Sequence, residues 1–286
     1  MPVSIVTDSV ASLPADLVAQ NGIEVVPLYV NDGERNQIET EMDLEAFYRR
    51  LADMRTLPTS SQPSVEAFLG AFRRAVERGG EVLGVFVSAK MSGTYETARM
   101  AAEMVTGELP AAVIDVFDSG SNSMQEGYAV LAAAAAARAG ETIERCKQAA
   151  AGALSRTRYL FSPASLEYLR RGGRIGGAAA LIGGLLQIKP ILTVERGETQ
   201  QFARARTQTR ALAEIARHFA DDVRAYGLAE VCVHYIADRE TAAKWATEAI
   251  SPIAGRDVRV IPVSPVIGLH VGPAIGIVYE TEREWT

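Results

Sequence analysis

The sequence predicts an α/β protein of two domains, the first with a mainly parallel sheet and flanking helices and the second with a mixed sheet. Apolar stretches of strand length alternate with helical patterns as far as Gly140, which is typical of successive β–α units. After that residue the alternation becomes irregular and a hairpin pattern appears, which indicates antiparallel pairing. The chain of 286 residues also exceeds the roughly 150 residues of one typical domain. We therefore expect the domains to comprise residues 1–156 and 157–286.

The first domain is expected to follow the β–α alternation closely, with right-handed crossovers. Asp43 and Ser64 stand where helix N-caps are expected, and Asn31-Asp-Gly is a turn signal. The predicted elements, in order, are strand 4–7, helix 15–20, strand 24–30, helix 43–54, helix 65–78, strand 82–87, helix 94–105, strand 112–118, helix 123–138 and helix 141–155.

The second domain is expected to mix helices with antiparallel pairs. A hairpin is predicted around Arg196-Gly-Glu, where two apolar stretches flank a short turn. The predicted elements, in order, are strand 158–161, hairpin strands 191–194 and 200–205, helix 209–226, strand 230–236, helix 239–250, strand 258–263 and strand 275–279.

Composition and charge argue against several classes of protein. Apolar residues make up 48% of the chain and charged residues 22%, so disorder is not indicated. The net charge of −6 argues against nucleic-acid binding, which usually needs a dense basic face. Cys146 and Cys232 form no CxxC pair, no basic leader is visible, and the longest central apolar stretch is too short for a bilayer span. We therefore expect a cytoplasmic protein, and one without a metal site, because its three histidines and two cysteines do not group.

The segment around Ser92 is the strongest candidate for a binding site. An apolar strand breaks at Ser88, and a helical pattern begins after Gly93. In an open α/β sheet this carboxyl edge is where ligands bind. Ser92, Gly93 and Thr94 would then lie at a helix start, where backbone N–H groups and the helix dipole favour an anion such as a carboxylate or a phosphate. No GxGxxG, GxxxxGK[ST], HExxH or GxSxG motif offers an alternative.

Two other polar segments are expected in loops that the fold could bring near Ser92. They are Thr59-Ser-Ser-Gln-Pro-Ser and Gly268-Leu-His-Val-Gly-Pro, the second with His270 between glycines. Taken alone, each hydroxyl could also be a helix cap, which is the commoner role of Ser and Thr after a strand. We expect His218, within a helix, and His234, within a strand, to be structural.

Five motifs in register resemble the DegV family over essentially the whole chain. They are Thr7-Asp-Ser, Thr59-Ser-Ser-Gln-Pro-Ser, Ser88-Ala-Lys-Met-Ser-Gly-Thr-Tyr, Leu169-Arg-Arg-Gly-Gly-Arg-Ile and His270-Val-Gly-Pro. The resemblance implies a DegV-like fold and a bacterial FakB-type protein. Such a protein binds a long-chain fatty acid between its domains, touches membranes transiently, and presents the carboxylate to a separate FakA-type fatty-acid kinase that forms the acyl phosphate. It implies no catalytic residues and no cofactor besides the bound lipid.

The resemblance also implies roles for individual residues. Ser92, with Gly93 and Thr94, matches the carboxylate-binding segment, and His270 matches the histidine of the same polar cluster. Ser60 or Ser61 falls where members carry a head-group hydroxyl, and the run Thr59-Ser-Ser leaves open which of the three serves.

Two arginines match residues that meet the kinase or the phosphate. They are Arg174 of the Gly-Gly-Arg motif and Arg206 after the following hairpin. Cations near an acyl phosphate would stabilise it, although these arginines could also only bridge the domains. The run Arg170-Arg-Gly-Gly-Arg could likewise be a helix C-terminus.

An apolar tunnel is expected for the acyl tail. Residues 175–188 combine small side chains that leave space with branched ones that could line it, although close helix packing explains the same composition. Two other functions remain open: a serine hydrolase that uses Ser92 with His270 as base and Asp8 as the best guess for the acid, or a lipid-sensing regulatory protein.

Overall fold

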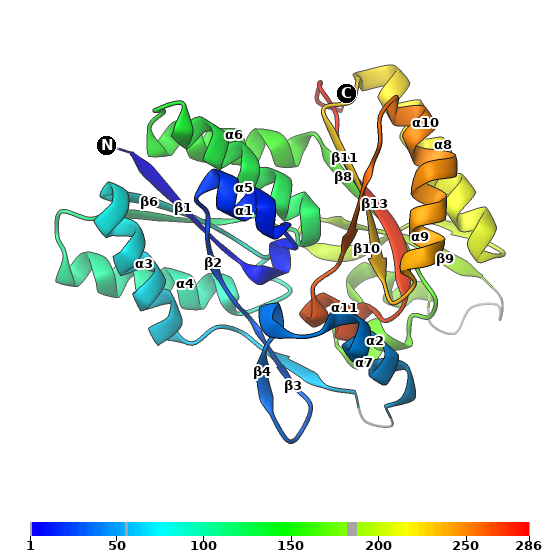
Figure 1. Ribbon diagram of the computed structural model, residues 1–286, viewed down its shortest axis with the longest axis horizontal. Helices are drawn as coiled ribbons and strands as arrows, with labels where there is room; N and C mark the ends of the chain where they lie inside the picture. Colours follow the sequence, from blue (N-terminus) through cyan, green and yellow to red (C-terminus); the bar gives the residue numbers. More distant parts are fainter. Residues whose placement is uncertain (1, 55–56, 182–187, 286) are drawn as a thin grey trace. The chain divides into compact units, whose positions relative to one another are not determined.

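The computed structural model describes residues 2–54, 57–181 and 188–285. The chain forms two compact units (Figure 1), of which the first comprises residues 1–41 and 60–154 and the second residues 42–59 and 155–286. The segment 42–59 therefore belongs with the C-terminal half of the chain. The domain boundary expected after residue 156 stays a prediction.

The first unit is built on a four-stranded parallel sheet in the order β2-β1-β6-β7. Because β1 has a neighbour on each side that follows it in sequence, the strand order reverses there, and the carboxyl ends of β1 and β6 lie at a topological switch point. The strands are β1 (Val3–Asp8), β2 (Glu24–Val26), β6 (Glu81–Phe86) and β7 (Val113–Asp118).

Helices cover both faces of this sheet, as Figure 1 shows. On β6, Val82 and Phe86 pack against α3 (Val65–Gly79) and α4 (Thr94–Glu108). The intervening Leu83 and Val85 pack on the opposite face, which is covered by α1, α5 and α6. These helices span Ala15–Asn21, Ser123–Arg138 and Ile143–Ser155, respectively. This alternation is the period of two that a strand requires, and it confirms a sheet buried on both faces.

One predicted strand, residues 24–30, is wrong as a single element. The chain breaks at Pro27 and Leu28, after which β3 (Tyr29–Asn31) leaves the parallel sheet and forms a small sheet of order β4-β3-β5. Its partners are β4 (Asn36–Ile38) and β5 (Thr59–Ser61). Proline has no N–H for a sheet ladder, which explains the break. Strands β3 and β4 form the hairpin whose turn was predicted at Asn31-Asp-Gly.

The second unit is built on a six-stranded mixed sheet in the order β10-β9-β8-β13-β11-β12. Its pairs are antiparallel apart from β11 and β12, which run parallel. The strands are β8 (Thr157–Pro163), β9 (Lys189–Glu195), β10 (Glu198–Ala205), β11 (Glu230–Ile236), β12 (Arg259–Pro262) and β13 (Ala274–Glu280). The mixed sheet expected from the sequence is thus present.

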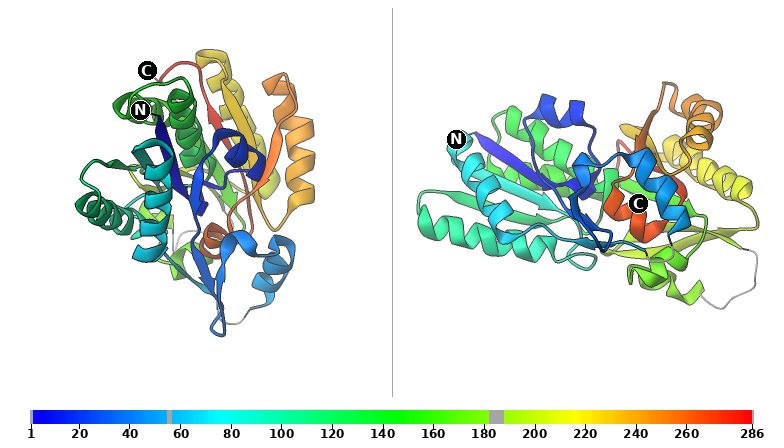
Figure 2. Two further views of the ribbon diagram at one scale, coloured as in Figure 1. Left: turned by 60° about the vertical axis from the view of Figure 1, so that its left-hand side comes forward. Right: turned by 60° about the horizontal axis from the view of Figure 1, so that its bottom comes forward.

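One face of this sheet carries α8 (Gln208–Tyr226) and α9 (Arg239–Trp245), which lie side by side in Figures 1 and 2. Phe219 of α8 and Trp245 of α9 pack with Val233 and Ile277 of the sheet in one buried core. The helix predicted at residues 239–250 continues beyond α9 as a π-helical segment, Ala246–Ile250, before the short α10 (Ser251–Ala254).

A second group of helices in this unit contains His270, one of the predicted site residues. Here α11 (Pro265–Val271) packs on α2 (Leu44–Asp53) and α7 (Glu167–Arg171). The Tyr48 hydroxyl donates a 2.8 Å hydrogen bond to the Val263 carbonyl, and its ring lies against Gly268. The expectation that His270 lies in a loop is therefore wrong: it occupies the last turn of α11.

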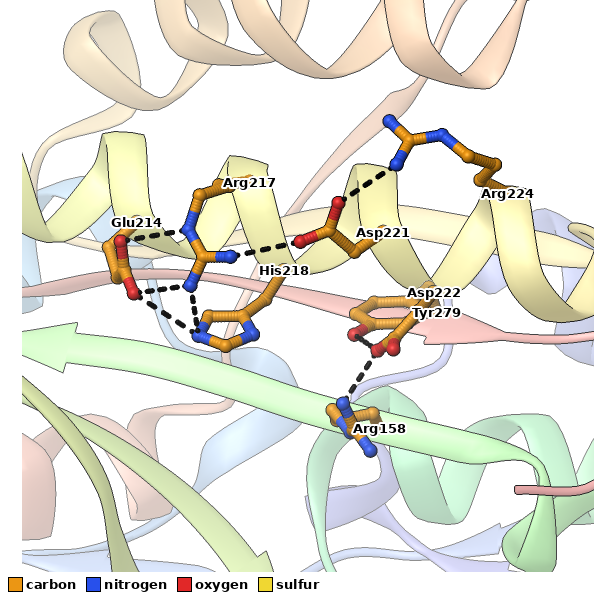
Figure 3. Close-up of polar contacts among 8 residues, drawn as sticks. All are labelled: Arg158, Glu214, Arg217, His218, Asp221, Asp222, Arg224 and Tyr279. Carbon is orange, nitrogen blue, oxygen red and sulfur yellow. Dashed lines mark hydrogen bonds and ion pairs between the residues drawn. The ribbon is translucent and has the colours of Figure 1, made fainter. Parts of the chain in front are cut away.

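A polar cluster fixes the C-terminal part of the second unit (Figure 3). Asp222 of α8 accepts hydrogen bonds from Arg158 at 2.6 Å and from the Tyr279 hydroxyl at 2.5 Å. The Arg158 guanidinium also stacks 4.3 Å above the centroid of the Trp285 ring. These contacts join α8, β8, β13 and the chain end.

Within the described residues, no helix has both the length and the apolar character that a bilayer crossing requires.

Candidate functional site

Hydroxyl groups gather at the N-terminus of α4, where the sequence predicts an anion site. The Ser92 Oγ atom lies 2.8 Å from the Thr94 Oγ1 atom and accepts the Thr94 N–H at 3.3 Å. Thr94 is buried and Ser92 is half-buried, and Gly93 is the N-cap residue of the helix. The positive end of this 15-residue helix and two adjacent hydroxyls give the turn the donors that a carboxylate needs.

The structure places Gln62, of the Thr59-Ser-Ser-Gln segment, beside this turn within the first unit. Gln62 Nε2 donates a 2.6 Å hydrogen bond to Thr97 Oγ1, which in turn donates to the Gly93 carbonyl at 3.1 Å. A Cβ atom on Gly93 would collide with the Gln62 side chain. Ser60 is half-buried and Ser61 exposed, on the strand β5 rather than in the expected loop. Two of the three predicted segments therefore meet.

His270 and Arg174 are brought together in the second unit. The His270 ring contacts Gly172, whose carbonyl accepts a 2.7 Å hydrogen bond from Arg174. Burial and, to a smaller extent, the positive charge of Arg174 together lower the pKa of His270 to about 4. The imidazole is therefore neutral near pH 7. The run Arg170-Arg-Gly-Gly is the end of α7, as the helix C-terminus interpretation predicted.

The low pKa of His270 predicts acid sensitivity of the second unit. An unfolded histidine titrates near 6.5, so between about 6.5 and about 4 the unfolded chain binds a proton that the folded chain does not. The free energy of unfolding should therefore fall as the pH falls through this window, by about 3 kcal/mol from this residue. Urea unfolding at about pH 7, 5.5 and 4.5 should show a smaller decline for His270→Gln than for the unchanged chain. Parallel declines would contradict the prediction.

Arg206 lies between the end of β10 and Thr207, the N-cap of α8, and it is exposed. Arg174 is exposed as well.

A support for the Ser92 turn lies in the loop after β7, which the sequence analysis did not single out. Asp118 Oδ1 accepts the Ala89 N–H at 3.1 Å and the Gly120 N–H at 2.8 Å. The Ser88 N–H donates to the Ser121 carbonyl at 2.8 Å. A carboxylate directly after a parallel strand, followed by Ser-Gly-Ser-Asn-Ser, was the signal that could have identified this loop.

Two buried carboxyl groups lie at the same sheet edge. Asp8 bridges the ends of β1 and β6: its Oδ1 accepts the Val10 N–H at 2.8 Å and its Oδ2 accepts the Val87 N–H at 2.9 Å. Burial raises the pKa of Asp8 to about 7. Burial also raises the pKa of Glu126 well above its usual range, and its Oε2 has no hydrogen-bond partner among the described residues, so we expect Glu126 to be protonated at neutral pH. Thr7 donates to its Oε1 at 3.4 Å.

This geometry disfavours the serine hydrolase alternative. Both oxygens of Asp8, the best guess for a catalytic acid, already accept backbone N–H groups of their own unit. His270, with a pKa of about 4, would be a weak general base near neutral pH. In the described part of the chain, no group of three or more histidine, cysteine or acidic side chains could hold a metal ion.

The expected tunnel segment is only partly described, because residues 182–187 lie outside the described residues. Gly176–Leu181 form a 3₁₀ helix that packs on β10, where Gly177 contacts the Gln200 side chain. Ala178 and Leu181 are buried. The tunnel stays a prediction.

Comparison with known proteins decides the family. Residues 2–282 match the model of an uncharacterised protein family, DegV. The chain belongs to the DegV family. A DegV domain-containing protein of Clostridium acetobutylicum is 42% identical over 284 residues, which cover 99% of each chain. The resemblance inferred from the five motifs is thus confirmed.

Solved structures of three other bacterial proteins share the fold. A DegV family protein from Thermus thermophilus, described as binding a fatty acid, has a TM-score of 0.90 and 32% identity. The match covers 98% of this chain and 100% of that protein. DegV from Bacillus subtilis, described as a fatty-acid-binding protein, has a TM-score of 0.88 and 30% identity over 98% and 99% of the two chains. A stearic-acid-binding protein from Eubacterium ventriosum has a TM-score of 0.88 and 25% identity over 98% of each chain. The two-unit α/β fold predicted from the sequence is confirmed.

Proposed function

We propose that this chain binds a long-chain fatty acid and holds its carboxylate at the N-terminus of α4. The observation that carries the proposal is the pair of adjacent hydroxyls, Ser92 and Thr94, at the positive end of that helix. Whole-chain likeness to fatty-acid-binding DegV proteins supports the same ligand. A carboxylate there would accept hydrogen bonds from hydroxyl and backbone donors without a metal ion.

The head group and the tail are expected to contribute differently. Burial of roughly 15 methylenes at about 0.8 kcal/mol each offers roughly 12 kcal/mol before the costs of association. The tail therefore sets the affinity, and the polar groups set the orientation. Ser60 or Ser61 on β5, and His270 on α11, are proposed to serve the same head group as Ser92, as the family resemblance implies.

The proposed role is that of a carrier rather than an enzyme. The chain would present the bound carboxylate to a separate fatty-acid kinase, with Arg174 and Arg206 facing the kinase or the transferred phosphate. Both arginines are exposed, which supports this assignment. The test is acyl-phosphate formation from ATP with a fatty-acid kinase of a related bacterium, in the presence and absence of this protein. Equal product without the protein would exclude the role.

Mass spectrometry of an organic extract of the purified protein tests the ligand directly. We expect about one long-chain fatty acid per chain, which would also give the acyl length. An empty extract, together with no binding of added palmitate or oleate, would exclude the proposed function and leave the fold unaffected.

Ser92→Ala is expected to weaken oleate binding about tenfold, because the lost hydrogen bond is to a charged group. If His270 serves the same carboxylate, the double variant Ser92→Ala/His270→Ala should lose less than the product of the two single effects. Titration calorimetry of the three variants measures this coupling.

Thr106→Ala is the matched control, because it removes a hydroxyl from the other end of α4, where the Thr106 hydroxyl donates to the Ala102 and Glu103 carbonyls of its own helix. Oleate affinity should be unchanged in this variant. If the losses of binding free energy in Ser92→Ala and His270→Ala add exactly in the double variant, His270 does not contact the same head group as Ser92.

A further inference from the structure

We propose that Asp118 is a positioning residue for the fatty-acid head group, because its carboxylate fixes the turn that carries Ser92. This inference rests on the proposed function and deepens it. Asp118 is the last residue of β7, the strand next to β6, from which the turn emerges.

The Ser92 turn is internally rigid. Its backbone folds back on Ser88, whose carbonyl accepts the N–H groups of Met91 at 2.9 Å and Ser92 at 3.1 Å. The Ser88 hydroxyl also accepts the Lys90 N–H at 3.2 Å. A displacement at Ala89 is therefore passed to the Ser92 hydroxyl rather than absorbed between them.

The loop after β7 holds this turn at three points. Asp118 Oδ1 accepts the Ala89 N–H, and the Ser121 carbonyl accepts the Ser88 N–H. The Asn122 amide lies 3.1 Å from the Met91 sulfur atom. Asp118 fixes the loop itself as well, because the same Oδ1 atom accepts the Gly120 N–H. The Asp118 Oδ1 atom thus joins the loop after β7 to the turn that carries Ser92.

Asp8 binds Val87, the residue just before Ser88, from β1, which flanks β6 on the side opposite β7. Asp8 uses both of its carboxylate oxygens, whereas Asp118 uses one. The N–H groups of Val10 and Val87 are bound by two different oxygens of Asp8. An asparagine can keep both bonds at position 118, where one oxygen accepts both N–H groups. At position 8 an asparagine must set an NH₂ group against a backbone N–H.

Hydrogen-bond strength falls steeply with distance and angle, so a binding hydroxyl must be held to within about 0.5 Å. Loss of the Asp118 acceptor should therefore weaken the binding of the ligand's carboxylate strongly and affect the burial of its tail only slightly. This difference separates a positioning role from a merely structural one.

The experiment compares Asp118→Ala, Asp118→Glu, Asp118→Asn and Asp8→Asn with the unchanged chain. Affinity is measured for oleate and for oleyl alcohol, which has the same tail without the carboxylate, and thermal unfolding is recorded for each variant. We expect Asp118→Ala and Asp118→Glu to lose about tenfold in oleate affinity and less than twofold for the alcohol. Asp118→Asn should recover most of that loss, and Asp8→Asn should not.

Oleate binding by Asp118→Ala at the strength of the unchanged chain would overturn the inference, as would equal losses for oleate and the alcohol. A loss in Asp118→Asn as large as in Asp118→Ala would also overturn it, because charge rather than the acceptor would then be the cause. If Asp118→Ala does not fold, Asp118→Glu decides, since it keeps the charge but misplaces the oxygen by one methylene.

The control with Ser92→Ala distinguishes the two proposals. An unchanged chain that binds no oleate overturns both. Suppose instead that the unchanged chain binds oleate, that Ser92→Ala weakens this binding, and that the Asp118 variants do not weaken it. In that case only the inference about Asp118 fails.

Discussion

Replacing Gly276 by alanine is expected to destabilise the second unit by about 3 kcal/mol, because the new methyl group has no space between two central strands. Gly276 lies in β13, where it pairs with Phe161 of β8 and with His234 of β11. A Cβ atom there would lie 2.6 Å from the Phe161 Cβ atom and 2.7 Å from the Leu160 carbonyl oxygen. The second of these is a backbone atom of a sheet interior, which cannot turn aside as a flexible side chain can.

Gly107→Ala makes the same substitution where no atom lies within 4 Å of the new Cβ. Gly107 is in α4, and alanine is the better helix former, so this variant should be as stable as the unchanged chain or up to about 1 kcal/mol more stable. Urea unfolding followed by circular dichroism measures both. If Gly276→Ala unfolds at the same urea concentration as Gly107→Ala, the two strands adapt and the argument from close packing fails.

The sequence predicted those elements whose pattern is local and strongly periodic. The helix at residues 123–138 and the strand at residues 230–236 have the predicted bounds. The helix α11 was missed because its side chains are buried nearly all round, so it lacks the polar face that reveals an amphipathic helix. Ser264 as N-cap, followed by Pro265, was the available start signal.

The candidate site was only partly predictable, for a physical reason. Ser92, Gly93 and Thr94 could be assigned because a strand end and a helix start are local features. The bonds that hold the turn are not local: Asp118 meets Ala89 across 29 residues, and Asp8 meets Val87 across 79. A sequence without the register of its strands cannot show which carboxylate reaches which N–H group, although it does show that both carboxylates end parallel strands.

The carboxyl edge of the first sheet is fixed by its own side chains. Carboxylates at the ends of β1 and β7 bind the backbone on either side of Ser88, at Val87 and at Ala89. The turn is thereby preorganised, and preorganisation lowers the cost of ordering the site when a head group binds. A site of this kind needs few polar contacts with its ligand, which fits the proposed carrier, whose affinity is expected to come from the tail.

Asp222→Ala is expected to lower the free energy of unfolding by about 3 kcal/mol, because it leaves two partly buried donors without their acceptor. Figure 3 shows Arg158 and Tyr279 directed at this carboxylate. Burial raises the pKa of Tyr279 well above its usual value, so its hydroxyl stays protonated and needs an acceptor. The stacking of Arg158 on Trp285 would also loosen, and the chain end with it.

Asp221 is the matched control, because it is the preceding residue of the same helix and also has two arginine partners, Arg217 and Arg224. Its side chain is 45% exposed, compared with 14% for Asp222, so solvent screens its ion pairs and Asp221→Ala should not measurably shift the unfolding midpoint. Equal effects of the two substitutions would show that the number of ion pairs, rather than their burial, determines stability here. The double variant Asp222→Ala/Tyr279→Phe should be less destabilised than the sum of its single variants, since the second change removes the hydroxyl that the first leaves unbonded.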